Sequence, residues 1–476
     1  MPYNHGIRVQ ENPTSVSAPS INTSGIPVIF GTAPVNMATD PANATNKLFL
    51  CNTFDEAKKA VGYSSDYEKY TLCQSMDAFF KMFGVGPIIV CNVLDPATHK
   101  TEYTETVTVT NSQAVTTESG VILSTLALTS DGSALVLDTD YTLEFTEEGY
   151  VLITVLKDEV ATIELTGSKI DASKVTEADV IGSYDTSTGV ETGIELVRKV
   201  YPLFNLVPGL LIAPGWSNKP AVALALAAKC TEISGVFQCE CVVDIDTTTV
   251  KKYTDVEAYK NTNGYNSKHM ICLWPKVQYA GKQYDYSAVY AAMVSYTDLN
   301  NDNVPYIASN QALGVTGTLL ADGTEVALDT IQANELNAIG VVTALNVGGF
   351  KSWGNNMACY PEVTDPKDRW INCRRFFSWW GNSFITTYME KVDNPANYRL
   401  IESIVDSENV RGNSLVSEGK CAGIRMEYNE SDNPVEAVMD GKIVFKQYLA
   451  PYTPAEDIVN VLEFDVTMIE TALGGE

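Results

Sequence analysis

Residues 25–31 read Gly25-Ile26-Pro27-Val28-Ile29-Phe30-Gly31, a short apolar run that ends at a glycine. Such a run is typical of a buried strand. Downstream, Thr53-Phe54-Asp55-Glu56 has the pattern of a capping box and predicts a short helix through Ala60. Large apolar residues then recur at helical spacing over residues 72–83, and residues 87–93 form a second apolar run. Strand, helix and strand in this order predict an α/β fold.

The sequence changes character after about Thr101. Short runs rich in Thr and Val alternate with turns such as Asp131-Gly132-Ser133, which is typical of a small all-β module inserted in the α/β chain. Residues 97–190 contain 16 acidic and 4 basic residues, so we expect a solvated outer module. Residues 351–420 contain 9 of each, and this neutral segment is better suited to contact another acidic body.

The α/β pattern resumes after the insertion. Strands are expected at 209–214, 236–245, 269–274 and 443–449, helices after Pro220 and over 286–296 and 397–420, and mostly extended chain over 340–375. The expected fold class is an α/β (α+β) core with a layered sheet and helices, an inserted small all-β domain, and extended N- and C-terminal β-arms. The expected parts are an N-terminal linking arm (1–25), the first part of the core (26–96), the inserted domain (97–190), the rest of the core with a tube-proximal C-terminal region (191–455) and a C-terminal linking strand (456–476).

Both ends of the chain carry the alternating pattern of a half-buried strand. Leu462-Glu463-Phe464-Asp465-Val466-Thr467-Met468 alternates without a break, and His5 to Glu11 carries a shorter version followed by a polar tether, Asn12 to Ser24. Such ends are suited to donate strands to neighbouring molecules. The predicted inter-subunit strand residues are Ile7, Arg8, Val9, Leu462, Phe464, Val466 and Met468. This arrangement indicates a polymer subunit rather than a catalyst.

Composition excludes several classes of function. The net charge of −27 disfavours nonspecific nucleic-acid binding, because neutralising phosphates requires an excess of Lys and Arg. Apolar runs are shorter than a membrane span needs, and the N-terminus lacks a Sec-type signal pattern, so no membrane insertion is expected. The ten cysteines have no framework spacing, which favours free thiols in a reducing cytoplasm, with Cys239 and Cys241 as buried packing residues.

Motifs of known enzyme classes are missing from the sequence. It has no Walker-type Gly-Lys-Ser/Thr, no G-x-S-x-G and no H-E-x-x-H, and its three histidines are far apart. We expect no enzyme, no catalytic residue, no metal and no cofactor. One alternative stays open: Asp244 and Asp246, at the end of a strand, could hold Mg²⁺ in a metal-dependent enzyme. The other interpretation is a strand leading into a Thr-rich turn.

Residues 374–380 combine basic and aromatic side chains, Arg374-Arg375-Phe376-Phe377 and Trp379-Trp380. Single-strand nucleic-acid binders use this mixture, and a carbohydrate-binding role for the Trp pair is a further alternative. In so acidic a chain the favoured interpretation is a strand with the Arg side chains outward and the aromatic side chains in the core.

Taken in order, blocks of this sequence resemble the tail sheath proteins of contractile phage tails and of the related phage-tail-like bacteriocins. The blocks are His5 to Glu11, Gly31-Thr32-Ala33-Pro34, Pro208 to Gly215 followed by Pro220-Ala221-Val222, Trp353-Gly354-Asn355, Trp370 to Arg375, Ser414 to Gly423, Gly441-Lys442-Ile443 and Pro454 to Ile458. The chain departs from the family pattern at Asn356, which stands where many relatives have Arg.

The resemblance implies a subunit that assembles with copies of itself in stacked hexameric rings around an inner tail tube protein. N- and C-terminal strands of two subunits would complete a sheet on a third, and the sheath would contract without nucleotide. It further implies baseplate and tail terminator proteins as partners, assembly in the bacterial cytoplasm, and a place in a virion tail or phage-tail-like particle. Within 397–420, the tube-contact candidates are Arg399, Arg411 and Lys420. A non-contractile tube or surface-layer protein is the remaining alternative.

Overall fold

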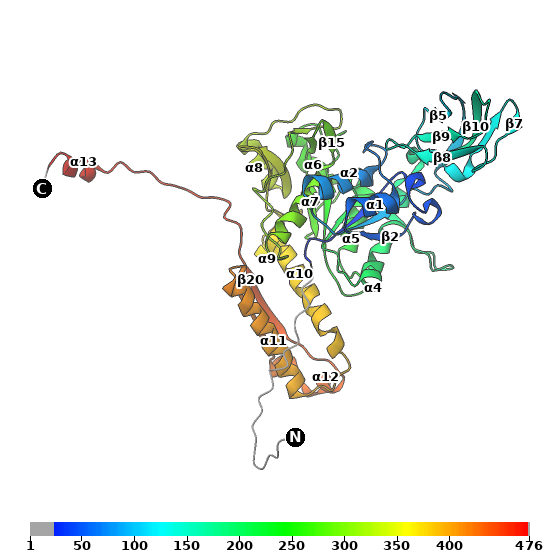
Figure 1. Ribbon diagram of the computed structural model, residues 1–476. Helices are drawn as coiled ribbons and strands as arrows, with labels where there is room; N and C mark the ends of the chain where they lie inside the picture. The colour runs from blue at the N-terminus through cyan, green and yellow to red at the C-terminus, as the bar shows by residue number, and fades with distance from the viewer. Residues whose placement is uncertain (1–22, 475–476) are drawn as a thin grey trace, which may run out of the picture.

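A computed structural model describes residues 23–474. Its centre is an eight-stranded sheet of order β18-β17-β13-β12-β11-β1-β3-β2 (Figure 1). The six inner strands are parallel, and the edge strands β2 and β18 are antiparallel to their neighbours. The strands are β1 (Pro27–Gly31), β2 (Leu48–Cys51), β3 (Ile88–Asn92), β11 (Leu210–Ile212), β12 (Glu240–Asp244), β13 (Met270–Leu273), β17 (Val341–Asn346) and β18 (Phe350–Trp353).

Helices cover this sheet and bury its inner strands. Every residue of β1, β3, β12 and β13 is buried, as expected for parallel strands rich in Val and Ile. Helices α2 and α7 contact each other and β1, β11 and β12, whereas α5 packs with α3. The helices of this part are α1 (Phe54–Val61), α2 (Thr71–Asp77), α3 (Glu177–Ile181), α4 (Val200–Phe204), α5 (Pro220–Lys229), α6 (Val256–Thr262), α7 (Tyr286–Leu299) and α8 (Thr330–Ala338). A small sheet joins β14 (Lys276–Tyr279), β15 (Lys282–Tyr284) and β16 (Gly317–Leu319). The predicted mixed α/β class is confirmed.

Residues 100–170 form two further sheets, of order β4-β10-β6-β7 and β5-β9-β8. They lie to one side of the central sheet (Figure 1) and share a separate core that includes Tyr103, Ile153 and Leu165. The strands are β4 (Lys100–Thr108), β5 (Gln113–Val115), β6 (Ala127–Ser130), β7 (Ser133–Ala134), β8 (Tyr141–Phe145), β9 (Val151–Val155) and β10 (Thr162–Ile170).

Residues 366–451 form a C-terminal module, in which two long helices lie side by side with a two-stranded sheet against them (Figure 1). Its elements are α9 (Pro366–Arg369), α10 (Ile371–Tyr388), α11 (Tyr398–Ser417), β19 (Cys421–Glu427), α12 (Val435–Met439) and β20 (Lys446–Pro451). Two small apolar clusters hold the module together, one around Trp379 and Trp380 and one around Tyr388 and Ile404.

The prediction of mostly extended chain over 340–375 is wrong after Trp353, because α9 and α10 begin within it. Asp365 caps α9 by accepting a hydrogen bond from the Lys367 amide (3.0 Å), and Pro366 occupies the first turn. In α10, Phe376 and Trp380 stack one turn apart, with ring centroids separated by 6.3 Å. The aromatic pattern therefore has a helical period. The predicted helix over 397–420 is confirmed by α11.

All ten cysteines are buried and free, as the absence of a framework spacing predicts. Burial raises the pKa of the Cys91 thiol to about 12, so this thiol stays protonated and acts as a small apolar side chain. Within residues 23–474, no helix combines the length and apolarity that crossing a bilayer requires.

Candidate functional site

The chain after β20 forms a long arm that extends away from the body (Figure 1). Residues 452–465 contain no helix or strand, and α13 (Val466–Ala472) begins where Asp465 accepts a hydrogen bond from the Thr467 amide (2.9 Å). The strand predicted over Leu462 to Met468 is therefore wrong for the single chain. Without a neighbouring strand the ladder hydrogen bonds cannot form, and the Asp465 cap favours local helical bonds instead.

The C-terminal arm, residues 452–474, exposes a series of apolar side chains. Leu462 is 86% and Phe464 81% exposed. Fully burying such a side chain contributes about 1.5–3 kcal/mol, and soluble monomers rarely leave so many uncovered. The exposed apolar residues of the arm include Ile458, Val459, Val461, Leu462, Phe464, Val466, Met468 and Ile469. The other predicted strand residues, Ile7, Arg8 and Val9, lie outside the described residues.

Only the first residues of the arm are fixed to the body, at its root. The Asn372 side chain on α10 donates to the Tyr452 carbonyl (2.8 Å). Asn355 donates to one Glu456 oxygen (3.0 Å), and Arg369 lies 3.6 Å from the other. These contacts direct the chain away from its own two-stranded sheet.

Arg369 lies next to Asn356, the position where many relatives have Arg. Its Nε donates to Asn356 Oδ1 (2.8 Å), and its guanidinium lies over the Trp370 ring, 3.9 Å from the centroid. A basic group therefore lies beside the Trp353 block, supplied by Arg369 from α9.

The two-stranded sheet β19–β20 offers two unpaired edges among the described residues. Ile424 and Leu449 pair on the face toward the helices, whereas Arg425 and Tyr448 pair on the outer face. A two-stranded sheet is marginal by itself, and unpaired backbone groups at its edges can accept another strand.

Gly412 allows α11 to approach this sheet closely. A Cβ added at Gly412 would lie 2.7 Å from the Ile424 Cβ and 2.8 Å from its Cγ2. Because that side chain is branched at Cβ and 7% exposed, it cannot easily move aside. The position of the sheet on the helices is thus set by a residue without a side chain.

The three tube-contact candidates differ in what surrounds them. Arg411 is buried: its Nη1 lies 3.4 Å from Glu408 Oε1 and its guanidinium 3.7 Å from the Trp380 ring centroid, and burial lowers its pKa. Lys420 donates to Asn301 (2.9 Å) and Asp302 (2.7 Å). Arg399 is exposed. Arg411 therefore offers little charge at the surface, because a core aromatic ring and an internal acid contact it, and Lys420 is already paired. Of the three candidates, Arg399 remains as a surface cation.

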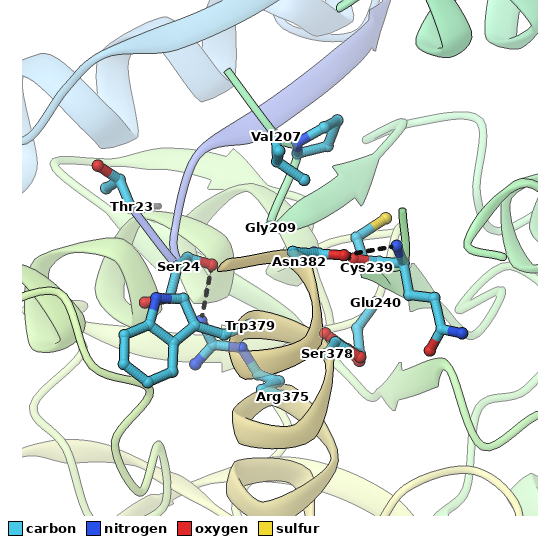
Figure 2. Close-up of a pocket in the computed structure, with 12 residues that line it drawn as sticks. Thr23, Ser24, Val207, Gly209, Cys239, Glu240, Arg375, Ser378, Trp379 and Asn382 are labelled. Atoms are coloured by element: carbon cyan, nitrogen blue, oxygen red, sulfur yellow. Dashed lines mark hydrogen bonds between the residues drawn. The ribbon is translucent and has the colours of Figure 1, made fainter. Parts of the chain in front are cut away.

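The interpretation of 374–380 as a strand with outward Arg side chains is also wrong, since both Arg side chains are buried on α10. Arg375 forms a two-pronged ion pair with Asp298 of α7, and its Nη2 also donates to the Ser24 carbonyl (3.3 Å; Figure 2). Ser24 in turn donates from Oγ to Asp298 (2.8 Å). The aromatic part of the prediction is confirmed, because Trp379 and Trp380 lie in the core.

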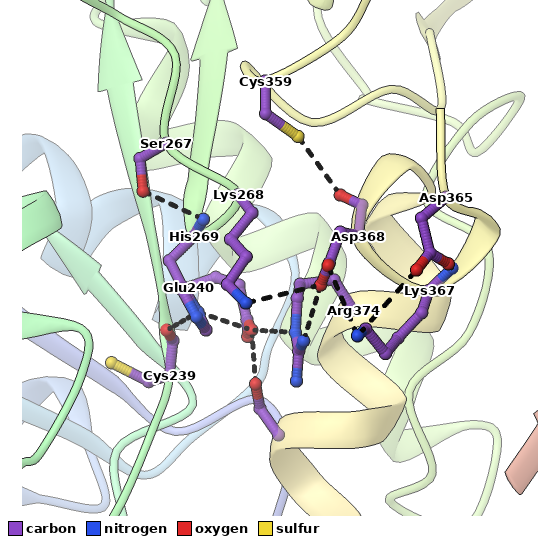
Figure 3. Close-up of polar contacts among 11 residues, drawn as sticks. Cys239, Glu240, Ser267, Lys268, His269, Cys359, Asp365, Lys367, Asp368 and Arg374 are labelled. Carbon is purple, nitrogen blue, oxygen red and sulfur yellow. Dashed lines mark hydrogen bonds and ion pairs between the residues drawn. The ribbon is translucent and has the colours of Figure 1, made fainter. Parts of the chain in front are cut away.

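Arg374 joins a second buried polar network (Figure 3). It donates to Asp368 (2.8 Å) and lies 4.0 Å from Glu240 at the start of β12. Burial raises the pKa of Glu240, but the hydrogen bond and charge interaction with His269 and the interactions with Arg374 and Ser378 outweigh it and lower the pKa. The network therefore holds an ionised carboxylate between the sheet and α10.

Asp244 and Asp246, the two residues considered for a metal site, form different contacts. Asp244 is buried and accepts hydrogen bonds from Ser217 Oγ (3.0 Å) and the Ser287 amide (2.8 Å). Burial and the nearby Asp285 raise its pKa to about 6. Asp246 instead accepts from the Thr248 amide (2.9 Å), which matches the turn interpretation. Across residues 23–474, His, Cys, Asp and Glu side chains form no group of three or more placed to hold a metal ion.

Sequence reasoning missed the residues that fix Ser24 and the start of the C-terminal arm. Asn355, Asn372 and Arg375 belong to blocks that the family resemblance singled out, but their partners are 101, 80 and 351 positions away. A helical reading of residues 371–380 would have placed Asn372 and Arg375 one turn apart on one helix.

Comparisons with known proteins agree on one class. No protein-family model matches the chain. It is 24% identical over 489 residues to the tail sheath protein of Burkholderia phage BcepMu, covering 99% of each chain. It is 23% identical to the tail sheath protein of Escherichia phage P2, covering 60% of this chain and 69% of that one.

Solved structures with the same fold come from contractile injection systems. The contracted sheath complex of the PVC extracellular contractile injection system superposes with a TM-score of 0.59 at 15% identity, covering 98% of this chain and 99% of that one. The anti-feeding prophage baseplate structure gives 0.58 at 14% identity, covering 98% and 100%. The sheath tail protein of Desulfitobacterium hafniense gives 0.51 at 10% identity, covering 89% and 93%. As the ordered sequence blocks predict, the chain is similar to phage tail sheath proteins, in one case along nearly its whole length.

Proposed function

We propose that this chain is the structural subunit of a contractile tail sheath, which polymerises around an inner tube. One observation carries the proposal: an arm rich in exposed apolar side chains leaves a module whose own sheet has two edges that no residue of 23–474 pairs with. Homology to tail sheath proteins over 99% of the chain supports the same function.

The linking step is strand exchange between subunits. The arm of one subunit joins the β19–β20 sheet of another, with Leu462, Phe464, Val466 and Met468 supplying the apolar contacts. Each ladder hydrogen bond contributes about 0.5–1.5 kcal/mol, and each buried apolar side chain about 1.5–3 kcal/mol. Converting α13 to a strand costs little, because an isolated helix of seven residues is marginal in water. Ile7, Arg8 and Val9 form the second donated strand.

In the assembled particle, subunits form stacked hexameric rings that contact the tube protein, the baseplate and a tail terminator. The extended sheath is metastable, and repacking of the interfaces between subunit bodies drives contraction. Residues 97–190 form the acidic outer domain, and assembly takes place in the bacterial cytoplasm. The work comes from interface free energy, and no catalytic residue or cofactor takes part.

Tube contact involves the exposed face of α11 around Arg399. Charge reversal by Arg399→Glu should weaken attachment of the sheath to its tube in co-sedimentation at low salt. Lys442→Glu, an exposed charge reversal in the same module but outside α11, is the matched control. Equal attachment of both variants and the wild type would remove Arg399 from the interface.

Negative-stain imaging of the chain, expressed alone and with its tube protein, tests the proposal. We expect tubular sheaths, with a long form around the tube and a short, wide form after release. A full-length chain that stays monomeric at high concentration contradicts sheath function. Filaments that keep the same axial rise per subunit before and after release would instead identify a static tube or surface-layer protein.

A further inference from the structure

The roots of both terminal arms meet on helix α10. At the N-terminal root, the Ser24 carbonyl accepts a hydrogen bond from Arg375 (Figure 2). The Ser24 hydroxyl donates to Asp298. Next to it, the Ser295 hydroxyl of α7 donates to the Gly25 carbonyl. The described chain therefore starts in a clamp between α7 and α10.

The centre of this clamp is the buried pair of Arg375 and Asp298. Both side chains are 1% exposed, and the two guanidinium nitrogens face the two carboxylate oxygens. The Tyr306 amide supplies a further donor to Asp298 (3.1 Å). Paired in this way, a charge-assisted contact is strong and directional, and removing one partner leaves an uncompensated buried charge.

The C-terminal root is attached one turn earlier on the same helix. Asn372 lies three positions before Arg375 and donates to the Tyr452 carbonyl (2.8 Å). Residues three apart on a helix are neighbours on its surface, separated by about 4.5 Å along the axis. Ser24 and Tyr452, 428 positions apart in sequence, are thus held at adjacent points on α10.

Further along, α10 is joined firmly to the central sheet. Arg374 lies beside Glu240 of β12 (Figure 3), and Ser378 donates to the same carboxylate. Asn382 donates to the Gln238 carbonyl and accepts from the Gln238 amide. Buried side chains on successive turns therefore hold the helix to the core.

We propose that α10 is the joint through which tension passes from one arm to the other, with Arg375 and Asp298 fixing the N-terminal root and Asn372 the C-terminal root. This inference rests on the proposed function, in which the arms link subunits. Because the anchors are adjacent, pulling force enters and leaves through one helical turn. The parallel sheet is not sheared, and the body can turn between its tethers during contraction.

The first test is hydrogen exchange of the isolated full-length chain. In the clamp variant, Arg375→Met and Asp298→Asn are combined. Hydrogen exchange of the amides of residues 24–26 should then become about tenfold faster or more, because a charged hydrogen-bonded contact is lost. The matched control is Arg411→Met with Glu408→Gln, which removes a buried Arg–acid pair of the same module that touches neither root. Exchange at 24–26 that is equal in both variants overturns the proposal.

The second test uses assembled sheaths triggered to contract. Sheaths of the clamp variant should assemble but break between rings during contraction, whereas control sheaths contract intact. If the clamp variant does not fold, Ser24→Ala and Asn372→Ala take its place. Each should cause a smaller increase in hydrogen exchange at its own root and a smaller increase in the fraction of broken sheaths. If the sheaths of every variant contract without breaking, the proposal that α10 is the joint is wrong. If the wild type forms no sheath, the proposed function fails, while the exchange result still decides whether the clamp fixes the root.

Discussion

The central sheet and the β19–β20 sheet solve the problem of exposed edges in opposite ways. Eight strands form the first, and its two edges are short antiparallel strands of four residues each, β2 and β18. Short edge strands are a common protection against unwanted pairing. The second has two strands and no such protection among the described residues, and an apolar arm begins at its end.

This difference indicates which part of the chain completes itself and which requires a second copy. The central sheet buries its strands under its own helices, so its stability belongs to the single chain. Two small clusters hold the helices of the C-terminal module, and no described residue pairs with the outer edges of its two strands. Changes in the arm should therefore affect assembly, whereas changes in the core should affect folding.

The largest expected effect comes from the arm. Leu462→Asp with Phe464→Asp should abolish assembly, because two side chains more than 80% exposed in the single chain would have to be buried as charges. Thermal unfolding of the single chain should stay unchanged. Deleting residues 460–476 should act in the same way.

The control for this change is Glu463→Gln with Asp465→Asn, polar positions of the same stretch, which should still assemble. Electron microscopy and calorimetry provide the two readouts. Normal sheaths from the Asp variant or the truncation would mean that this arm does not link subunits.

The second effect concerns how the open sheet is held. Gly412→Ala should destabilise the C-terminal module by about 1–3 kcal/mol, as overpacking does, because the new methyl meets the Ile424 side chain. Gly381→Ala, in the interior of α10 with no atom within 4 Å of the added Cβ, should instead stabilise by about 0.5–1 kcal/mol. Urea unfolding followed by Trp fluorescence compares them, and equal midpoints would contradict the close approach of helix and sheet.

The smallest expected effect is the pH dependence of stability that buried Asp244 produces. The pKa of Asp244 is raised to about 6, so the folded chain holds a proton that the unfolded chain has lost, and this group lowers stability as pH rises from about 4 to about 6. Lys276, near Asp285, partly opposes the shift. Asp244→Asn cannot titrate, so its stability relative to the wild type should increase by roughly 1–2 kcal/mol between about pH 5 and about pH 7. A difference between the two proteins that does not change with pH would contradict this assignment.

Sequence reasoning reached the α/β core because continuous apolar runs there match burial, as at β12, where every residue is buried, and at α7, where most residues are. It failed where the decisive partner is remote or external. Phe376 and Trp380 have a helical spacing that the strand interpretation does not explain. The inward position of Arg375 depends on Asp298, which is 77 positions away in sequence. The alternation over Leu462 to Met468 predicts a strand, but a strand needs a pairing partner, and within residues 23–474 no strand pairs with this stretch.

A cryo-electron microscopy reconstruction of the assembled polymer, at a resolution that traces backbone, tests the central claim most directly. The account predicts that residues around Leu462 and Phe464 of one subunit run as a strand along β19 or β20 of another, with α13 unwound. An arm that folds back onto the sheet of its own chain, or that remains outside every sheet in the polymer, would contradict it.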